Sequence, residues 1–187
     1  MSDKKRFNLL NKLVKQNGIV LWGSTSLDEP SVHELIQGSS VSQNVYNRSV
    51  SGLKVSDAQQ YLEQCVYGLS PAKVIINLGE EDVKCCTDVT QLMEQYRWLL
   101  YNMHVALPAC RFVVTTVPGK GEACESFNEE LKKLAQEVGC SFYRIPEISE
   151  EGEYVPTFLS AVKLSLYDSG LGYTSIATKA VFDLMTQ

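Results

Sequence analysis

Residues 18–27 read Gly-Ile-Val-Leu-Trp-Gly-Ser-Thr-Ser-Leu, a short apolar run that ends in a glycine and three hydroxyl side chains. A run of this length bounded by glycines is typical of a buried β-strand. It is far shorter than the ~20 apolar residues that a membrane-spanning helix needs. The stretch therefore predicts a core strand whose end carries polar, potentially functional side chains.

Similar β-rich runs alternate with longer segments of helical period along the rest of the chain. Further strands are predicted at 44–46, 73–78, 111–117 and 141–145. Helices are predicted at 30–37, 56–67, 89–106 and 124–138. Alternation of this kind is typical of βαβ units. We expect an α/β fold, a three-layer doubly wound sandwich with about five parallel strands.

A helix is also expected at each end of the chain, and both are expected to pack on the sheet. The apolar residues that define their faces are Phe7, Leu10, Leu13 and Val14 at the start, and Tyr173, Ile176, Ala177, Ala180, Val181 and Leu184 at the end. No linker or low-complexity tract interrupts the pattern. Residues 1–187 are therefore expected to form a single domain, with 1–17 as its N-terminal helix.

The composition excludes some classes of function. Lys and Arg number 17 and Asp and Glu 22, which gives a formal net charge of −5. An acidic chain repels nucleic acid, so a general nucleic-acid-binding protein is not expected. No charged-then-apolar leader opens the sequence, which favours a cytoplasmic protein. The oligomeric state is not determined by the sequence, and an acidic monomer is the simplest expectation.

The six cysteines do not form a metal-binding or disulfide pattern. The chain contains no Cys-x-x-Cys pair, Cys85 and Cys86 are adjacent, and neither His33 nor His104 lies at zinc-finger spacing from another ligand. Cys110 and Cys140 border apolar runs, where a free thiol behaves as a small hydrophobe. We expect reduced thiols, no metal ion and no cofactor.

Ligands in a doubly wound fold bind outside the carboxyl ends of the strands. The loop after the first strand carries Ser24, Thr25 and Ser26, which are either candidate nucleophiles or turn-capping residues. The second loop ends in Gly52, whose backbone N–H is a candidate donor to an anion. These two loops are the first place to look for a site.

The loop after the strand at 73–78 carries three consecutive carboxylates, Glu80, Glu81 and Asp82. Such a cluster binds a hard cation, raises the pKa of one member by like-charge crowding, or begins a solvated helix. The residue types alone leave these alternatives open.

The order of the motifs resembles the SGNH, or GDSL-type, hydrolase family. The matching blocks are Gly-x-(Ser/Thr) at 23–25, Val-Tyr-Asn-Arg-x-Val-Ser-Gly at 45–52, Val-Ile-Ile-Asn-Leu-Gly-x-x-Asp at 74–82 and Tyr-Asp-Ser-Gly-Leu-x-Tyr at 167–173. The similarity runs from about Gly18 onward. It implies a flavodoxin-like fold and ester or thioester hydrolysis.

Carried over by position, the resemblance keeps the framework and alters most of the chemistry. Gly23 and the oxyanion glycine Gly52 match, whereas Ser24 replaces the family's Asp and Thr25 takes the place of the nucleophilic serine. A one-residue shift of the first block makes Ser26 the nucleophile instead. Glu81 takes the place of the oxyanion-hole asparagine.

The C-terminal block keeps the triad acid as Asp168 but has Gly172 in place of the histidine. Loss of the base alone costs about 10⁶ in kcat in a comparable serine enzyme. An ionised Glu81 only accepts hydrogen bonds and repels an oxyanion, whereas a protonated one would donate; crowding by its neighbours would favour that form.

Three hypotheses follow from the sequence. The first is a hydrolase fold with a degenerate centre that binds a ligand or partner, such as a small acyl ester or a carbohydrate-like molecule. The second is an active acylhydrolase using Ser24, Thr25 or Ser26 with Asp168, Glu81 or His33 as the base. The third is a divalent-cation site at Glu80, Glu81, Asp82 and Asp168. The segment 150–164 is either a lid or a surface loop.

Overall fold

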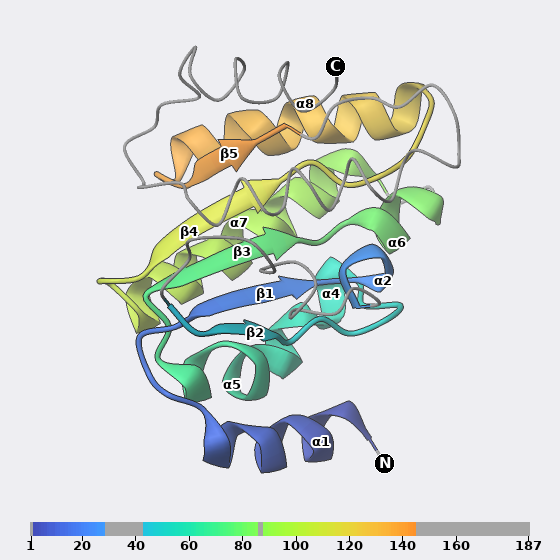
Figure 1. The fold of residues 1–187 in the computed structure, drawn as a ribbon. Coiled ribbons are helices and arrows are strands. Elements are labelled where there is room, and N and C mark those ends of the chain that lie inside the picture. The colour runs from blue at the N-terminus through green and yellow to red at the C-terminus, as the bar shows by residue number, and fades with distance from the viewer. Residues whose placement is uncertain (1, 29–42, 86–87, 145–187) are drawn as a thin grey trace, which may run out of the picture.

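The computed structural model describes residues 2–28, 43–85 and 88–144, and its centre is a parallel five-stranded sheet (Figure 1). The strands are β1 (Ile19–Gly23), β2 (Val45–Asn47), β3 (Lys73–Asn77), β4 (Arg111–Thr115) and β5 (Ser141–Tyr143). Their order in the sheet is β2-β1-β3-β4-β5, and every neighbouring pair is parallel. All five predicted strands and the α/β fold class are confirmed, with boundaries shifted by one or two residues.

The two central strands are buried along their whole length. Residues of β1 and β3 pair in continuous register from Ile19 with Lys73 to Gly23 with Asn77, and each of them is buried. Alternate side chains such as Trp22 and Ile76 join one large core cluster. The intervening ones, such as Leu21, are equally buried, so both faces of these strands are covered.

The long helices cover the core face of the sheet. They are α7 (Val89–Ala106) and α8 (Glu122–Glu137), which contact each other, and α7 also contacts the short α4 (Val55–Ala58). The helix predicted at 89–106 is confirmed at both ends, and the one predicted at 124–138 begins two residues earlier. The helices predicted at 30–37 and at the C-terminus lie outside the described residues.

The segment predicted as one helix at 56–67 is instead wound in short pieces. After α4 come a 3₁₀ turn (Gln59–Tyr61), α5 (Leu62–Cys65) and a second 3₁₀ turn (Tyr67–Leu69). Buried residues keep the three- and four-residue spacing that predicted a helix, but Val66 leaves helical geometry at φ −129° and ψ −64°. Ser70 then adopts a left-handed φ of 43° and ends the segment directly before Pro71, at the predicted stop.

The N-terminal helix is present, but it packs on α5 and not on the sheet as predicted, and of its predicted apolar face Phe7 is buried and Val14 partly buried. It comprises α1 (Asp3–Leu10) and a 3₁₀ turn (Asn11–Leu13), and α1 packs against α5, which lies between it and the sheet (Figure 1). Phe7 is buried under the guanidinium of Arg48, 5.4 Å from the ring centre. Leu10 and Leu13 are 42% and 82% exposed. Only a narrow strip of a short helix reaches α5, so these leucines face away.

No helix in the described part of the chain has the length and apolarity required to cross a bilayer.

Phe7 is expected to anchor α1 to the body of the protein. Replacing it with Ala should lower the free energy of unfolding by about 3–5 kcal/mol, because the ring is 2% exposed and its removal leaves a cavity. The exposed Leu13→Ser variant should change it by less than about 0.5 kcal/mol. Urea denaturation of both variants tests this, and equal losses would contradict the packing of α1.

Candidate functional site

The loops that follow β1, β2 and β3 meet at the carboxyl edge of the sheet. The chain leaves β1 toward β2 on one side, while β3 lies on the other, so this edge contains the topological switch point of the fold. Thr25 opens the short helix α2 (Thr25–Asp28), and Glu80 opens α6 (Glu80–Lys84). Ser51 and Gly52 come from the loop after β2. The structure therefore brings the three predicted loops together.

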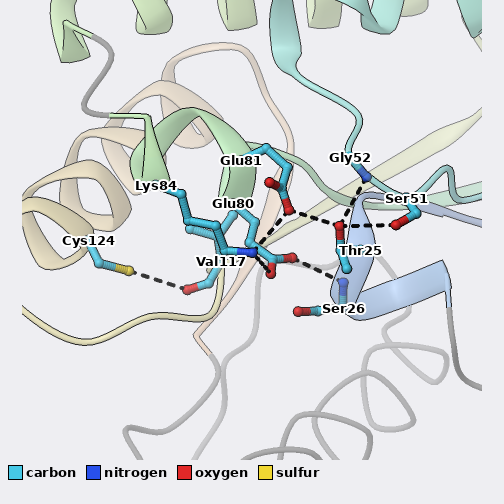
Figure 2. A network of polar contacts seen from close by, with 9 residues as sticks. All are labelled: Thr25, Ser26, Ser51, Gly52, Glu80, Glu81, Lys84, Val117 and Cys124. Carbon is cyan, nitrogen blue, oxygen red and sulfur yellow. Dashed lines mark hydrogen bonds and ion pairs between the residues drawn. The ribbon is translucent and has the colours of Figure 1, made fainter.

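The hydroxyl of Thr25 is the centre of a polar network. Its Oγ1 donates to Oε1 of Glu81 at 2.8 Å and accepts from the backbone N–H of Gly52 at 3.0 Å. The hydroxyl of Ser51 is 3.4 Å away. Figure 2 shows these contacts converging on one oxygen atom from α6 and from the loop after β2.

Glu81 is held in its ionised form. Lys84 donates a hydrogen bond to its Oε1 at 3.0 Å, and Thr25 donates to the same oxygen. The Lys84 contact first, and the Thr25 contact second, lower the pKa of Glu81 below its ordinary value. The alternative in which crowding by neighbouring carboxylates raises this pKa is therefore not the one observed. Glu81 is thus an acceptor and not an oxyanion donor.

Glu80 serves a different pair of partners. Its Oε2 accepts from the backbone N–H of Ser26 at 3.1 Å, and its Oε1 accepts from Lys84 at 2.7 Å. The carboxylate is buried, while Lys84 is about half exposed. The i, i+3 and i, i+4 spacing on α6 places one ammonium between both glutamates (Figure 2).

Asp82 faces away from the hydroxyls. It is buried, and its Oδ2 accepts from the backbone N–H of Val55 at 3.0 Å, which fixes the first turn of α4. Burial raises the pKa of Asp82 above its ordinary value. The three consecutive carboxylates thus have three different environments. Among the described residues no group of three potential ligands is placed to hold a metal ion, so the geometry does not support the cation hypothesis there.

The three hydroxyls of the first loop occupy unequal positions. Ser24 is fully buried, its N–H donates to Asn77 O at 3.1 Å, and no described residue hydrogen-bonds its Oγ. It is therefore not presented to a ligand. Gly23 precedes it because a Cβ would lie 2.7 Å from the same carbonyl. Ser26 is partly buried and contributes its backbone N–H, so Thr25 is the central hydroxyl.

Gly52 supplies a backbone conformation that other residues rarely adopt. Its φ is +75°, and this left-handed turn points its N–H at Thr25. A Cβ added at this position would contact nothing within 4 Å, so the glycine is required by its φ and not by crowding.

Three of the residues singled out in the sequence, His33, Asp168 and Gly172, lie outside the described residues. His104 is at the end of α7, where its ring packs 4.6 Å from Phe112 and its Nδ1 lies 2.9 Å from Leu100 O. Sequence reasoning missed Ser51 and Lys84. The spacing of Lys84 behind Glu80 and Glu81 was the available signal.

The described cysteines are free thiols, as expected. They are Cys65, Cys85, Cys110, Cys124 and Cys140. Burial raises the pKa of Cys65, Cys110 and Cys140 to about 12, so these three stay protonated and unreactive at neutral pH. Cys124 is buried in α8.

Comparison with protein-family models and with curated protein sequences gives no match. Solved structures are similar in fold. A Streptococcus pneumoniae protein named for platelet activating factor aligns with a TM-score of 0.75 at 14% identity, over 88% of this chain and 91% of its own. A GDSL-like lipase from Bacteroides thetaiotaomicron aligns with a TM-score of 0.69 at 16% identity, over 87% and 96%.

An acetylxylan esterase from Geobacillus stearothermophilus aligns with a TM-score of 0.64 at 13% identity, over 87% of this chain and 99% of its own. At such low identity the likeness establishes the fold. The chain has the SGNH, or GDSL-type, hydrolase fold that its motifs resemble.

Gly79 is expected to be essential for placing Glu80 and Glu81. Its φ is +112°, and a Cβ there would lie 2.3 Å from the ring of Phe127. Gly79→Ala should lower the free energy of unfolding by about 2–5 kcal/mol, from strain of about 1–2 kcal/mol and overpacking of about 1–3 kcal/mol.

Gly121→Ala is the matched control, because Gly121 has a φ of +99° and open space around it. Gly121→Ala should lower the free energy of unfolding only by the cost of backbone strain, about 1–2 kcal/mol. Thermal unfolding distinguishes the two variants, and Phe127→Leu should partly rescue Gly79→Ala. Equal losses in both alanine variants would disprove the role of the Phe127 contact.

Asp82 is expected to act through its hydrogen bond and not its charge. Asp82→Ala leaves the Val55 N–H without its acceptor and should cost about 1–3 kcal/mol. Asp82→Asn keeps an acceptor oxygen.

Because the native pKa of Asp82 lies above the unfolded one, the wild type loses stability as pH rises from the ordinary value through the raised one. Asp82→Asn should therefore compare more favourably with the wild type at pH 7 than at pH 3. Chemical denaturation at both pH values measures this, and the opposite trend would contradict it.

Proposed function

We propose that this protein binds a small, hydroxyl-rich ligand at the carboxyl edge of its sheet and does not hydrolyse esters there. The location of the site follows from the fold, in which ligands bind at the carboxyl edge of the sheet. The supporting observation is the closed network around Thr25, whose hydroxyl both donates to an ionised carboxylate and accepts from Gly52.

The network opposes hydrolysis at its first step. A base must accept the hydroxyl proton as the nucleophile attacks, and its strength follows its pKa. Lys84 keeps the pKa of Glu81 low, which makes this carboxylate a weak base. In the position where the related family has its histidine, this chain has Gly172. Loss of the base alone costs about 10⁶ in kcat in a comparable enzyme.

The network also opposes stabilisation of a tetrahedral intermediate. The N–H of Gly52 is directed at Thr25, and the N–H of Ser26 is directed at Glu80. A single lost oxyanion donor costs about 10²–10³ in kcat. The side chain that takes the place of the family's asparagine is the anionic Glu81, which repels developing negative charge.

The same groups are suited to binding a polar ligand. Ser51 and Lys84 are exposed, and Glu81 keeps about a fifth of its side chain accessible. Hydroxyl, ammonium and carboxylate groups within one network recognise sugar hydroxyls through paired donors and acceptors. The acetylxylan esterase with this fold supports a carbohydrate-like ligand, with an acylated oligosaccharide as the specific candidate.

A second candidate function is acylhydrolase activity with Glu81 as the base. The 2.8 Å contact between Thr25 and Glu81 is the geometry that a nucleophile and its base require. Glu81 would take the Thr25 proton, Oγ1 would attack the ester carbonyl, and the alcohol would leave with that proton. Water would then hydrolyse the acyl-enzyme and restore Thr25. Ser24 is excluded from this role by its burial.

Labelling with a fluorophosphonate probe, followed by mass spectrometry of the site peptide, distinguishes the two functions. We expect no modification of Ser24, Thr25 or Ser26. Hydrolysis of p-nitrophenyl acetate should be no faster for the wild type than for the isosteric Thr25→Val variant. Labelling at Thr25, or activity that Thr25→Val abolishes, would establish the acylhydrolase instead.

Binding is tested separately by thermal shift with acetylated xylo-oligosaccharides. At a hundredfold excess over Kd the ligand should stabilise the protein by about 2.7 kcal/mol, seen as a rise in Tm of a few degrees. Ser51→Ala and Glu81→Gln should remove the rise, whereas the distant Lys133→Gln should not. No shift in the wild type would refute this ligand class.

A further inference from the structure

The first sixteen residues of the chain carry a net charge opposite to that of the rest. Residues 1–16 contain five basic residues and one acidic residue, a net charge of +4, whereas residues 17–187 contain 12 basic and 21 acidic residues, a net charge of −9. The basic residues are thus concentrated on α1 and the 3₁₀ turn that follows it. This element forms the outermost layer of the molecule beyond α5 (Figure 1).

The outward face of this element is both apolar and basic. Lys5, Leu9 and Leu13 follow one another at four-residue spacing, so they share one face, and Lys12 is adjacent to Leu13. Leu9 and Leu13 are 54% and 82% exposed. Phe7, on the other side, is buried and attaches the element to the body.

The lysines of this face are unpaired within the described part of the chain. Arg6 pairs with Asp3, and the ammonium of Lys4 lies over the ring of Tyr61. Neither Lys5 nor Lys12 makes an ion pair with a described residue. Their charge is therefore available to an external partner.

We propose that the face formed by Lys5, Leu9, Lys12 and Leu13 binds the surface of an anionic lipid bilayer. A helix that combines exposed leucines with lysines on one face lies in the plane of the interface, with its leucines among the acyl chains and its ammonium groups among anionic headgroups. The net charge of +4 is complementary to such a surface. Attachment through Phe7 keeps α1 folded on the protein while its outer face is engaged.

The arrangement of this face favours a bilayer over a second copy of the chain. A convex helix face packs on a protein partner only where that partner has a matching groove, whereas the lipids of a bilayer rearrange around inserted leucine side chains. Because α1 lies at one extreme of the molecule, the described strands and the other described helices lie on the side away from the membrane (Figure 1). The polar site at the sheet edge then stays accessible to solvent.

Co-sedimentation with vesicles of phosphatidylcholine, with and without 30% phosphatidylserine, tests the proposal. The full chain should bind only the phosphatidylserine vesicles, and 0.5 M NaCl should release most of it. Lys5→Glu with Lys12→Glu should lower the partition coefficient at least about tenfold. Leu9→Ser with Leu13→Ser should lower it to a similar extent.

Trp98→Ser with Tyr101→Ser is the matched control, since these two stacked rings form an exposed apolar pair on α7 and are 58% and 57% exposed. This variant should bind vesicles like the wild type. All variants should keep the wild-type Tm, which shows that they fold.

Two results would overturn the proposal. One is no binding to phosphatidylserine vesicles, or binding that the control variant loses and the α1 variants keep. The other is a dimer in analytical ultracentrifugation that Leu9→Ser with Leu13→Ser dissociates, which would assign the face to a second copy.

Discussion

The continuous parallel pairing of β1 with β3 is the constraint on which the rest of this structure depends. The two strands are buried on both faces, so they cannot slip in register without exposing apolar side chains. Their carboxyl ends are therefore fixed side by side, with Gly23 opposite Asn77. The contacts of the polar site follow from this alignment, because Thr25 and Glu81 lie within four residues of the ends of β1 and β3.

Two glycines give the segments after β2 and β3 the backbone conformations that bring the polar groups of the site together. Gly79 turns the chain out of β3 at a φ that a side chain resists, directly beneath Phe127, and so starts α6 with its glutamates facing α2. Gly52 turns the loop after β2 until its N–H reaches Thr25. Lys84, one turn into α6, then donates a hydrogen bond to each of the two glutamates. The backbone turns at Gly52 and Gly79 and the ammonium of Lys84 together hold the site in place.

Much of the fold could be predicted from the sequence, because its signals are local. The strands and the helix at 89–106 follow from apolar periodicity and from glycine or Ser-Pro stops. The face of the first helix could not be predicted, because four apolar residues offered several faces and only packing on α5 selects Phe7. The broken helix after Lys54 escaped prediction for a related reason, since 3₁₀ turns keep nearly the same apolar spacing.

In the site, too, the features that depend on neighbours in the sequence could be predicted, and those that depend on neighbours in space could not. The loops, Thr25, Gly52 and Glu81 were identified from their places after the strands. Acidic neighbours in sequence left a raised pKa of Glu81 as one of several alternatives, yet the pKa is lowered because its neighbours in space are Lys84 and Thr25. A row of like charges says little about ionisation until the direction of each side chain is known: Glu80 and Glu81 share Lys84, whereas Asp82 accepts from the backbone of Val55.

The contacts of Thr25 and Glu81 also bear on the proposed function. A carboxylate in place of the oxyanion-hole asparagine is incompatible with a developing negative charge, but it is compatible with a hydroxyl donor. Thr25 is such a donor, and the N–H of Gly52 that would serve an oxyanion is satisfied by the same threonine oxygen. The residues at positions 25 and 81 are therefore mutually consistent: Thr25 donates to the carboxylate of Glu81, and under the proposed function the two form part of the polar-ligand site.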